Sequence, residues 1–282
     1  MINEKLIYQK GSVCLFYRIK KAFSMEIIFL GTGAAEGIPS IDCDCKHCKI
    51  ALEKRGKFIR ERSSLLFKIN SFNLLVETPP DIGHQLIAHN IRDLHVILLT
   101  HNHFDHTGGI KEFEYWKKKA TLFAEQEVME SVVREYWTEK LAKLFLKVPF
   151  YAGSILNFGS FSITPFPVHH SINTPTYGFM INYKNQKIAY LSDAQGLGKY
   201  TSYLLKDADL IIANTPFFEP PTENHISTVE AIKLKDELNA KKLVLTHINH
   251  YNKPYDELVN YCNQFKNVIV AYDGMKITIN DG

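Results

Sequence analysis

The chain has 282 residues, of which 45% are hydrophobic and 22% are charged, proportions typical of a globular protein long enough for one large domain. Its formal net charge of +3 is too small for a concentrated basic face, so a nucleic-acid substrate is not excluded but is not favoured. No stretch approaches the roughly 18 to 20 uninterrupted apolar residues of a membrane span. We therefore expect a cytoplasmic protein without a membrane partner.

Residues 1–24 are expected to form a peripheral N-terminal extension. The apolar run 13–17 is too short for a signal peptide, and basic residues follow it rather than precede it. Residues 25–30, followed by Gly31-Thr32-Gly33, predict a strand that runs into a glycine turn. No linker divides residues 25–282, so we expect them to form a single domain.

Short strands and helices alternate along this domain. In chain order the sequence predicts a helix near 50–56, strands over 64–69 and 73–77, a helix over 82–89 capped by Asp81, a strand over 95–100, a helix over 110–118, a strand and then an amphipathic helix within 121–147, strands over 161–168, 177–183, 187–192 and 210–213, a helix over 228–237, a strand over 242–246, a helix over 255–265, and strands over 268–271 and 276–279. Strand pairs in both halves of the chain favour two sheets packed face to face and covered outside by helices.

The run from His101 to His106 contains four side chains able to bind a metal, directly after the apolar run 96–100. Strand ends of this kind are where α/β proteins place their chemistry. His101 and His103 are two residues apart on a predicted loop, so both imidazoles can turn to one side of an extended backbone and share an ion. Asp105 and His106 can point to a second position nearby.

Three later residues of ligand type also follow apolar runs: His170, Asp193 and His247. A lone His or Asp at a strand end is more often a cap or a surface residue. Their recurrence beside the run 101–106 favours ligands on one rim of the sheets instead.

This pattern resembles the signature of the metallo-β-lactamase superfamily, a His-x-His-x-Asp-His run with a later His, Asp and His. The resemblance extends over nearly all of residues 25–282. It implies an α/β fold, a four-layer αβ/βα sandwich in which two mixed β-sheets pack face to face with helices outside. It also implies two metals in the cleft between the sheets.

The resemblance further implies how the ligands divide. One metal would be held by His101, His103 and His170, the other by Asp105, His106 and His247, with Asp193 bridging the two. His169 is the neighbouring alternative to His170, which we prefer because the ligand in the family precedes a small residue, here Ser171. The expected ions are Zn²⁺ or Mn²⁺, because His103 stands where the oxygen-reducing di-iron branch has Glu.

Five cysteines, three of them at Cys43, Cys45 and Cys48, are typical of thiolates kept reduced for a metal and not of a disulfide framework. A fourth ligand would close a tetrahedral structural Zn²⁺ site. We favour His250 as that ligand, with His47 as a local alternative. Three reduced cysteines without a metal are the other interpretation.

The cysteine loop and the Thr-His-x-x-His segment 246–250 resemble, more narrowly, the phosphoribosyl cyclic phosphate phosphodiesterases of phosphonate breakdown. That branch also has an Asn-His after a Pro-rich loop, here in segment 220–225. The resemblance implies that His225 protonates the departing alkoxide while a metal-bridging hydroxide attacks phosphorus. A neighbour of a helix N-cap is the alternative interpretation of His225. Where the superfamily usually has Asp, this chain has Glu77, so either Glu77 or Asp81 would orient a ligand.

The expected function is hydrolysis of a small cyclic phosphate or related phosphodiester by a dinuclear centre, in which His225, Asp105 and Asp193 take part. An endonuclease of RNase Z type, which processes tRNA 3′ ends, would be expected to have a protruding basic arm, and the sequence shows none. A non-enzymatic metal-binding or cofactor-biosynthesis accessory protein would be favoured by missing ligands, whereas all seven are present. Lactamase or thioesterase chemistry would use the same ligands, and a homodimer is left open.

Overall fold

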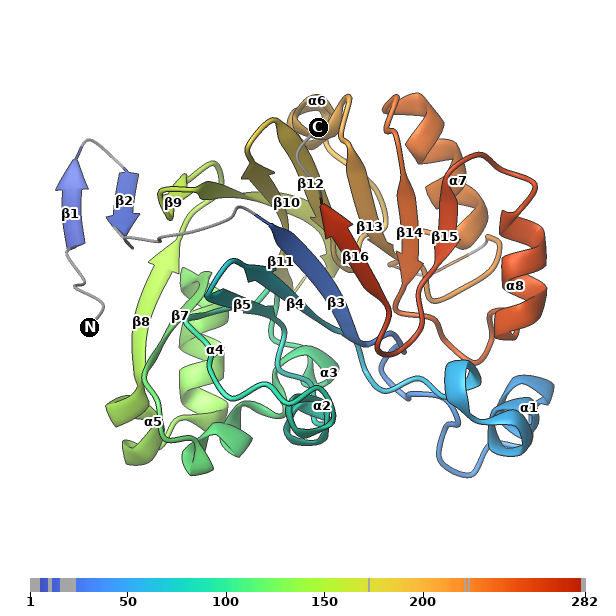
Figure 1. The fold of residues 1–282 in the computed structure, drawn as a ribbon, viewed down its shortest axis with the longest axis horizontal. Coiled ribbons are helices and arrows are strands. Elements are labelled where there is room, and N and C mark those ends of the chain that lie inside the picture. Colours follow the sequence, from blue (N-terminus) through green and yellow to red (C-terminus); the bar gives the residue numbers. More distant parts are fainter. Residues whose placement is uncertain are drawn as a thin grey trace.

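The computed structural model of the protein describes residues 6–9, 12–15, 24–171, 173–220, 222 and 224–279. Two β-sheets lie against each other in the middle of the molecule, and helices cover the outer face of each (Figure 1). This is the four-layer αβ/βα sandwich that the sequence predicts. Apart from two short strands, β1 (Leu6–Gln9) and β2 (Ser12–Leu15), the expected extension 1–24 lies almost entirely outside the described residues.

One sheet has nine strands. Besides β1 and β2 they are β9 (Leu156–Asn157), β10 (Phe161–Ser171), β11 (Thr174–Tyr183), β12 (Gln186–Leu191), β13 (Leu210–Asn214), β14 (Leu243–Thr246) and β15 (Val268–Val270). Their order across the sheet is β1-β2-β9-β10-β11-β12-β13-β14-β15. The last four strands pair in parallel, so the carboxyl ends of β12, β13 and β14 meet at one edge.

The other sheet has seven strands. They are β3 (Met25–Gly31), β4 (Ser64–Ile69), β5 (Phe72–Val76), β6 (Val96–Leu98), β7 (Ala120–Glu125), β8 (Phe145–Phe150) and β16 (Lys276–Ile279). Their order is β16-β3-β4-β5-β6-β7-β8. Strands β5 to β8 are parallel, which again brings strand ends with their following loops to one edge.

The helices are α1 (Lys46–Lys54), α2 (Ile82–Ala88), α3 (Phe104–Thr107), α4 (Gln126–Tyr136), α5 (Glu139–Leu144), α6 (Lys199–Leu205), α7 (Thr228–Glu237) and α8 (Tyr255–Cys262), with 3-10 helices η1 (Gly56–Phe58) and η2 (Ile110–Tyr115). Within the described part of the chain, none of these helices has the length and apolar character needed to cross a membrane.

Three apolar cores hold the layers together. Side chains of both sheets, such as Phe67 and Phe179, fill the space between the sheets. A second core joins the nine-stranded sheet to α1, α6, α7 and α8, and a third joins the seven-stranded sheet to α2, η2, α4 and α5. Fully burying one such side chain contributes about 1.5 to 3 kcal/mol, so this packing fixes how the two strand edges face each other.

Most of the predicted elements are confirmed, and three have the predicted bounds: β4, α7 and β16. Helix α1 begins earlier than expected because the Cys45 thiol sulfur accepts a hydrogen bond from the backbone N–H of Cys48 and so caps it. Helix α8 ends at Cys262, three residues before the expected end, and α6 and β9 were not predicted.

Two predictions are wrong. The helix expected over 110–118 is the short 3-10 helix η2. The helix expected within 121–147 ends at Tyr136; Thr138 caps a second helix, α5, and residues 145–150 form strand β8. The buried residues at the start of β8, Phe145 and Val148, are three apart, a spacing that resembles a helical period.

Candidate metal centre

The run 101–106 leaves the carboxyl end of β6 as a loop and then turns into α3, where a loop alone was expected. His103 occupies the N-cap position with an extended backbone, and its carbonyl oxygen accepts hydrogen bonds from the N–H groups of His106 and Thr107. This turn separates His101 and His103 from Asp105 and His106.

The structure brings the seven predicted ligands together in two groups. The first ligand group consists of His101, His103 and His170, and the second consists of Asp105, His106 and His247. In the first, His103 Nδ1 lies 3.0 Å from His101 Nε2 and 3.3 Å from His170 Nε2. Three imidazole nitrogens converge there on one point, as ligands of a single ion do.

The second ligand group is equally compact. Asp105 Oδ2 lies 3.2 Å from His106 Nε2 and 3.8 Å from His247 Nε2. His106 Nε2 is buried and makes no hydrogen bond with the described residues, whereas Nδ1 of the same ring faces Glu77. A buried polar atom without a partner is costly, so the donor set fits a divalent cation at this position.

Asp193 lies between the groups. Its Oδ2 atom is 3.7 Å from both His101 Nε2 and His170 Nε2, and its Oδ1 atom is 3.5 Å from His247 Nε2. Oδ2 also lies 3.4 Å from His106 Nε2 of the second group, so the carboxylate contacts ligands of both groups, as a bridging ligand does.

Burial and mutual charge shift the pKa values in this cluster in opposite directions. Burial lowers the pKa of His101 well below its usual value. Burial also opposes protonation of His106, but the carboxylates of Asp105, Asp193 and Glu77 outweigh it and raise the His106 pKa. Burial alone would raise the pKa of Asp193, but the charges of His247 and His106 outweigh burial and lower that pKa. The pKa of Asp105 is lowered as well, so the carboxylates of Asp105 and Asp193 are ionised and able to bind a cation.

Neighbouring groups orient these ligands. Glu77 is completely buried, with Oε1 at 3.2 Å from His106 Nδ1, and it accepts a hydrogen bond from Thr100 Oγ1 at 2.5 Å. Because Thr100 donates to Glu77, its oxygen must accept from His101 Nδ1, which is 2.8 Å away. Of the two candidates for the orienting role, Glu77 is therefore the one that takes it. Asp81 does not, because its carboxylate binds the N–H and guanidinium of Arg62 and makes no helix-cap bond either.

Two supporting contacts were not predicted. The Asn214 amide donates to Asp193 Oδ1 at 2.8 Å, and His170 Nδ1 donates to the Asn224 carbonyl oxygen at 2.7 Å, which leaves His170 Nε2 free to bind a metal. Asn214 ends an apolar strand just as the ligands follow theirs, and this is the signal that could have identified it. The Asn224 contact is made by its backbone carbonyl, so the residue type at this position gives no indication of it.

His247 has a left-handed backbone, with a φ of 57°, which costs energy for a non-glycine residue. The next residue, Ile248, is fixed on both sides: its N–H donates to the Thr32 carbonyl at 2.9 Å, and its carbonyl accepts from the Ala34 N–H at 3.1 Å. The glycine turn after β3 therefore holds this ligand in place. A Cβ atom on Gly33 in that turn would lie 2.8 Å from the Arg60 carbonyl oxygen.

The cysteine loop also assembles around one histidine. Cys43 Sγ and Cys45 Sγ lie 3.2 Å and 3.6 Å from His250 Nδ1, and Cys48 belongs to the same cluster. Burial opposes ionisation of Cys45, but hydrogen bonds from Cys48 and His250 lower its pKa to about 6. His47 is not part of the cluster, since its Nδ1 contacts the Asn252 carbonyl oxygen at 3.2 Å.

His225 lines the hollow of about 460 Å³ above both ligand groups, together with residues such as Glu36, Ser171 and Phe217. We call this the first hollow. The His225 ring centroid is 4.8 Å from that of His170 and 6.2 Å from that of His247. Burial lowers the pKa of His225 to about 4, and its Nδ1 has no hydrogen-bond partner among the described residues. The next helix along the chain, α7, is capped by Ser227 and not by His225.

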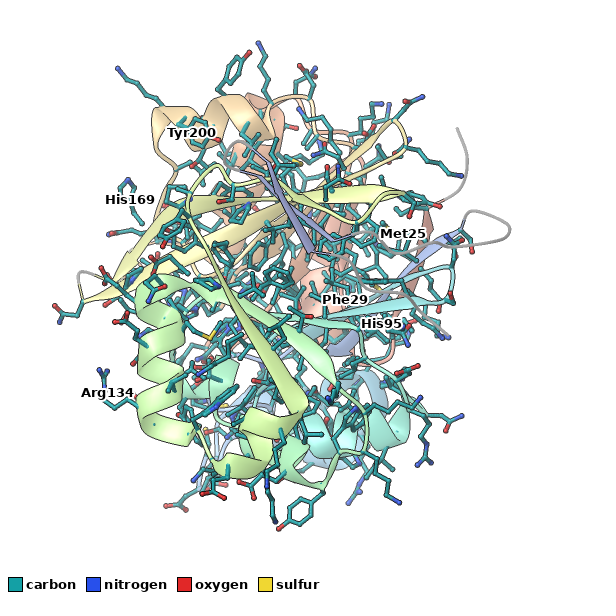
Figure 2. All side chains as sticks on the ribbon, turned by 90° about the vertical axis from the view of Figure 1, so that its left-hand side faces the viewer. Met25, Phe29, His95, Arg134, His169 and Tyr200 are labelled. Carbon is teal, nitrogen blue, oxygen red and sulfur yellow. The ribbon has the colours of Figure 1, made fainter. Side chains whose placement is uncertain are left out.

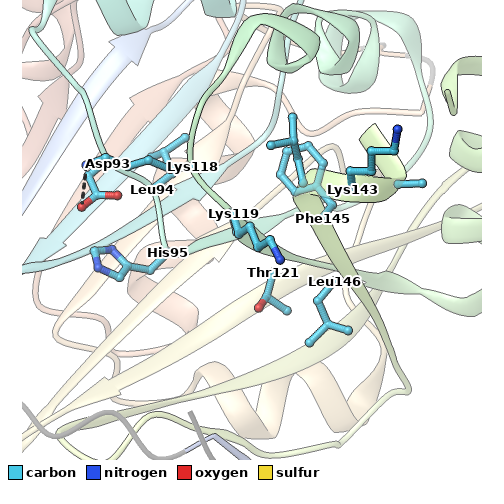
Figure 3. A pocket seen from close by; sticks show the side chains of 12 residues that line it. Asp93, Leu94, His95, Lys118, Lys119, Thr121, Lys143, Phe145 and Leu146 are labelled. Carbon is cyan, nitrogen blue, oxygen red and sulfur yellow. Dashed lines mark ion pairs between the residues drawn. The ribbon is translucent and has the colours of Figure 1, made fainter. Parts of the chain in front are cut away.

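A separate cavity of about 510 Å³ lies at the opposite ends of the parallel strands, before β6, β7 and β8 (Figure 3). Lys118 forms an ion pair with Asp93 there at 3.1 Å, and Lys119 and Lys143 are also in its wall. None of the seven predicted ligands lines it. The chemistry of the molecule is therefore concentrated at the other edge.

Comparison with known proteins agrees with this geometry. The family model described as "Beta-lactamase superfamily domain" matches residues 72–248. The octanoyltransferase of Porphyromonas gingivalis is 25% identical over 271 residues, which are 91% of this chain and 52% of that protein. The chain thus spans about half the length of this curated relative.

Two solved structures have the same fold. A diphosphatase of the PhnP family is 21% identical, with a TM-score of 0.80 over 91% of this chain and 98% of that one. Zn²⁺-bound PqqB from Methylobacterium extorquens is 20% identical, with a TM-score of 0.76 over 89% of this chain and 99% of that one. The fold predicted from the sequence is confirmed.

Proposed function

This chain belongs to the metallo-β-lactamase superfamily, and we propose that it is a metal-dependent hydrolase, a dinuclear phosphodiesterase acting on a cyclic phosphate or related diester. The ions would be Zn²⁺ or Mn²⁺, one in each ligand group. When bound, two such cations would lower the pKa of a shared water from 15.7 towards ~7 and neutralise charge on the phosphoryl oxygens.

The protein residues have distinct roles in this proposal. Asp193 would hold the two sites at a fixed separation, because its carboxylate contacts ligands of both groups. Glu77 and Thr100 fix the rings of His106 and His101 so that each points one nitrogen into the centre. Positioned groups of this kind reduce the reorganisation needed when charge develops on the phosphate.

The observation that carries the phosphodiester proposal is the position of His225. Its unpartnered Nδ1 belongs to a ring that lies beside ligands of both groups and lines the first hollow. An alkoxide is a poor leaving group that needs a proton, and the position of His225 lets it deliver one to an oxygen leaving phosphorus.

We also propose that Cys43, Cys45, Cys48 and His250 bind a structural Zn²⁺. The thiolate character of Cys45 and the convergence of all four donors support this. Such an ion would join the loop before α1 to the segment just after His247. A His101→Ala/Asp193→Ala double variant should then still contain about one zinc per chain.

The two alternative functions have less support. No lysine or arginine is among the described residues that line the first hollow, which weighs against the tRNA substrate of an RNase Z-like endonuclease. The complete set of seven ligand residues weighs against a non-enzymatic accessory role. The homodimer stays a prediction.

The test is hydrolysis with Mn²⁺ and with Zn²⁺ of bis(p-nitrophenyl) phosphate, a ribose cyclic phosphate, a β-lactam and a thioester. His225→Ala should lower kcat on the ribose cyclic phosphate by at least about 10²-fold. The loss should be smaller with the p-nitrophenyl ester, because nitrophenolate leaves without a proton. His84→Ala is the matched control, since His84 is exposed and pairs with Glu61. Turnover of only the thioester or the β-lactam would overturn the proposal, and an equal loss on both phosphates would remove His225 as the acid.

A further inference from the structure

A second hollow, of about 580 Å³, adjoins the first where β10 and β11 meet. The two share His170, Ser171 and Asn224. Figure 2 shows His169, which lines this second hollow, at the outer side of the molecule, on the side where Arg134 also lies. A group attached to a phosphate in the first hollow can therefore extend directly into the second.

The second hollow offers polar side chains that have no hydrogen-bond partner among the described residues. The imidazole of His169 and the side-chain amides of Gln195 and Asn224 line it. All three residues are exposed, and none of these side chains makes a hydrogen bond with another residue of the described part. Free amide and imidazole groups both donate and accept, which suits the hydroxyl groups of a ligand.

The described lining of both hollows carries no lysine or arginine side chain. Glu36, in contrast, lines the first hollow and Glu127 the second. Burial, together with the nearby carboxylates of Glu125 and Glu127, raises the pKa of Tyr177, another lining residue. An anionic group placed there would therefore meet the Glu127 carboxylate and, among the described lining residues, no lysine or arginine.

The nearby guanidinium of Arg134 does not offset the negative charge of the carboxylates. It lies in a third, smaller hollow of about 260 Å³, whose lining also includes Glu127 and Glu130. Its guanidinium Nη2 donates to Ser131 Oγ at 3.0 Å, and Asn102 donates to the same oxygen. Two carboxylates thus accompany the one guanidinium.

We propose that the substrate is a phosphodiester whose only negative charge is on the scissile phosphate, and that the second hollow receives an uncharged, hydroxyl-bearing group attached to it. The inference rests on the proposed phosphodiesterase function and narrows it. A second phosphate on the substrate would face Glu127 without compensation, and like charges brought together oppose binding.

The test compares two substrates that differ by one phosphate. Thymidine 5′-(p-nitrophenyl phosphate) carries a single charge, and its 3′-phosphorylated form carries the additional anionic group. We expect kcat/KM to be at least about tenfold lower for the 3′-phosphorylated form. Binding of thymidine and of thymidine 3′-phosphate to the metal-free protein, measured by ligand-detected NMR, should show the same order.

Substitutions at Glu127 test whether its carboxylate causes the difference in kcat/KM. Glu127→Lys should reduce the ratio of the two kcat/KM values at least about threefold, and Glu127→Gln should reduce it by a smaller factor. Glu139→Lys is the matched control, because Glu139 is an exposed first-turn residue of α5 that lines none of these hollows. Circular dichroism checks that each variant is folded.

The outcomes separate this inference from the proposed function. The inference alone is overturned if the 3′-phosphorylated form is turned over equally fast or faster. It is also overturned if Glu127→Lys leaves the difference in kcat/KM between the two substrates unchanged. Turnover of bis(p-nitrophenyl) phosphate but of neither thymidine ester also overturns it. If no phosphodiester is hydrolysed, the proposed function fails and the inference fails with it.

Discussion

Replacing Glu77 with Gln should weaken metal binding in both ligand groups, because one buried carboxylate supports a histidine in each. Glu77 contacts His106 directly and His101 through Thr100. Gln keeps the shape and an accepting oxygen but removes the charge. A hydrogen bond to a charged group contributes about 1.5 to 3 kcal/mol and a neutral one about 0.5 to 1.5. The difference of about 1 to 1.5 kcal/mol corresponds to roughly tenfold in affinity.

Competition titration of Zn²⁺ against a chelating indicator measures this effect. Glu77→Gln should weaken both binding events roughly tenfold. Thr100→Val removes the hydrogen bonds to His101, Glu77 and Ser192 but keeps the direct contact of Glu77 with His106, so it should weaken mainly one. Glu26→Gln is the control, because Glu26 pairs with Lys276 at 3.6 Å at the other end of the sheet. Unchanged affinity in Glu77→Gln, or equal weakening of both events in Thr100→Val, would refute the reasoning.

Three further predictions concern stability and zinc. Phe179→Ala, between the sheets, should lower the free energy of unfolding in urea by about 3 to 5 kcal/mol; a loss below about 1 kcal/mol would contradict the packing described. Cys48→Ser should remove about one zinc per chain by atomic absorption, and unchanged content would exclude the structural site. Burial raises the pKa of Asp273 to about 7 in the folded protein, above its value in the unfolded chain. Its stabilising contribution should therefore be present below about pH 4 and lost as the pH rises through about 7, by about 4 kcal/mol, and Asp273→Asn should abolish that part of the pH dependence.

The sequence predicted the candidate metal ligands well, because few residue types bind metal ions. All seven predicted ligands converge, because each lies at the end of an apolar strand or in the segment after it, and these strand ends meet at one edge. The choice between His169 and His170 is also visible in the fold. Residues in a strand alternate in direction, so His170 is buried against the ligands while His169 is exposed and lines the second hollow.

Other features depend on contacts that sequence does not mark. Strand β8 was missed because its apolar spacing resembles that of a helix, and only pairing with β7 decides between the two. Glu77 and Asp81 were equivalent candidates in sequence. They differ in the fold because Arg62 occupies the Asp81 carboxylate, whereas the Glu77 carboxylate is buried against His106 and Thr100.

The sequence alone therefore determined the class of fold, the run 101–106 with its later partners, and the cysteine loop, because strand periodicity and metal-ligand chemistry are local or recur along the chain. Only the tertiary structure decided which residues support the ligands, that Asp193 faces both groups, and that the adjoining hollows have no positive charge in their described lining. These properties arise when loops from both sheets meet at one edge, and their distances are set by the packing of the two sheets.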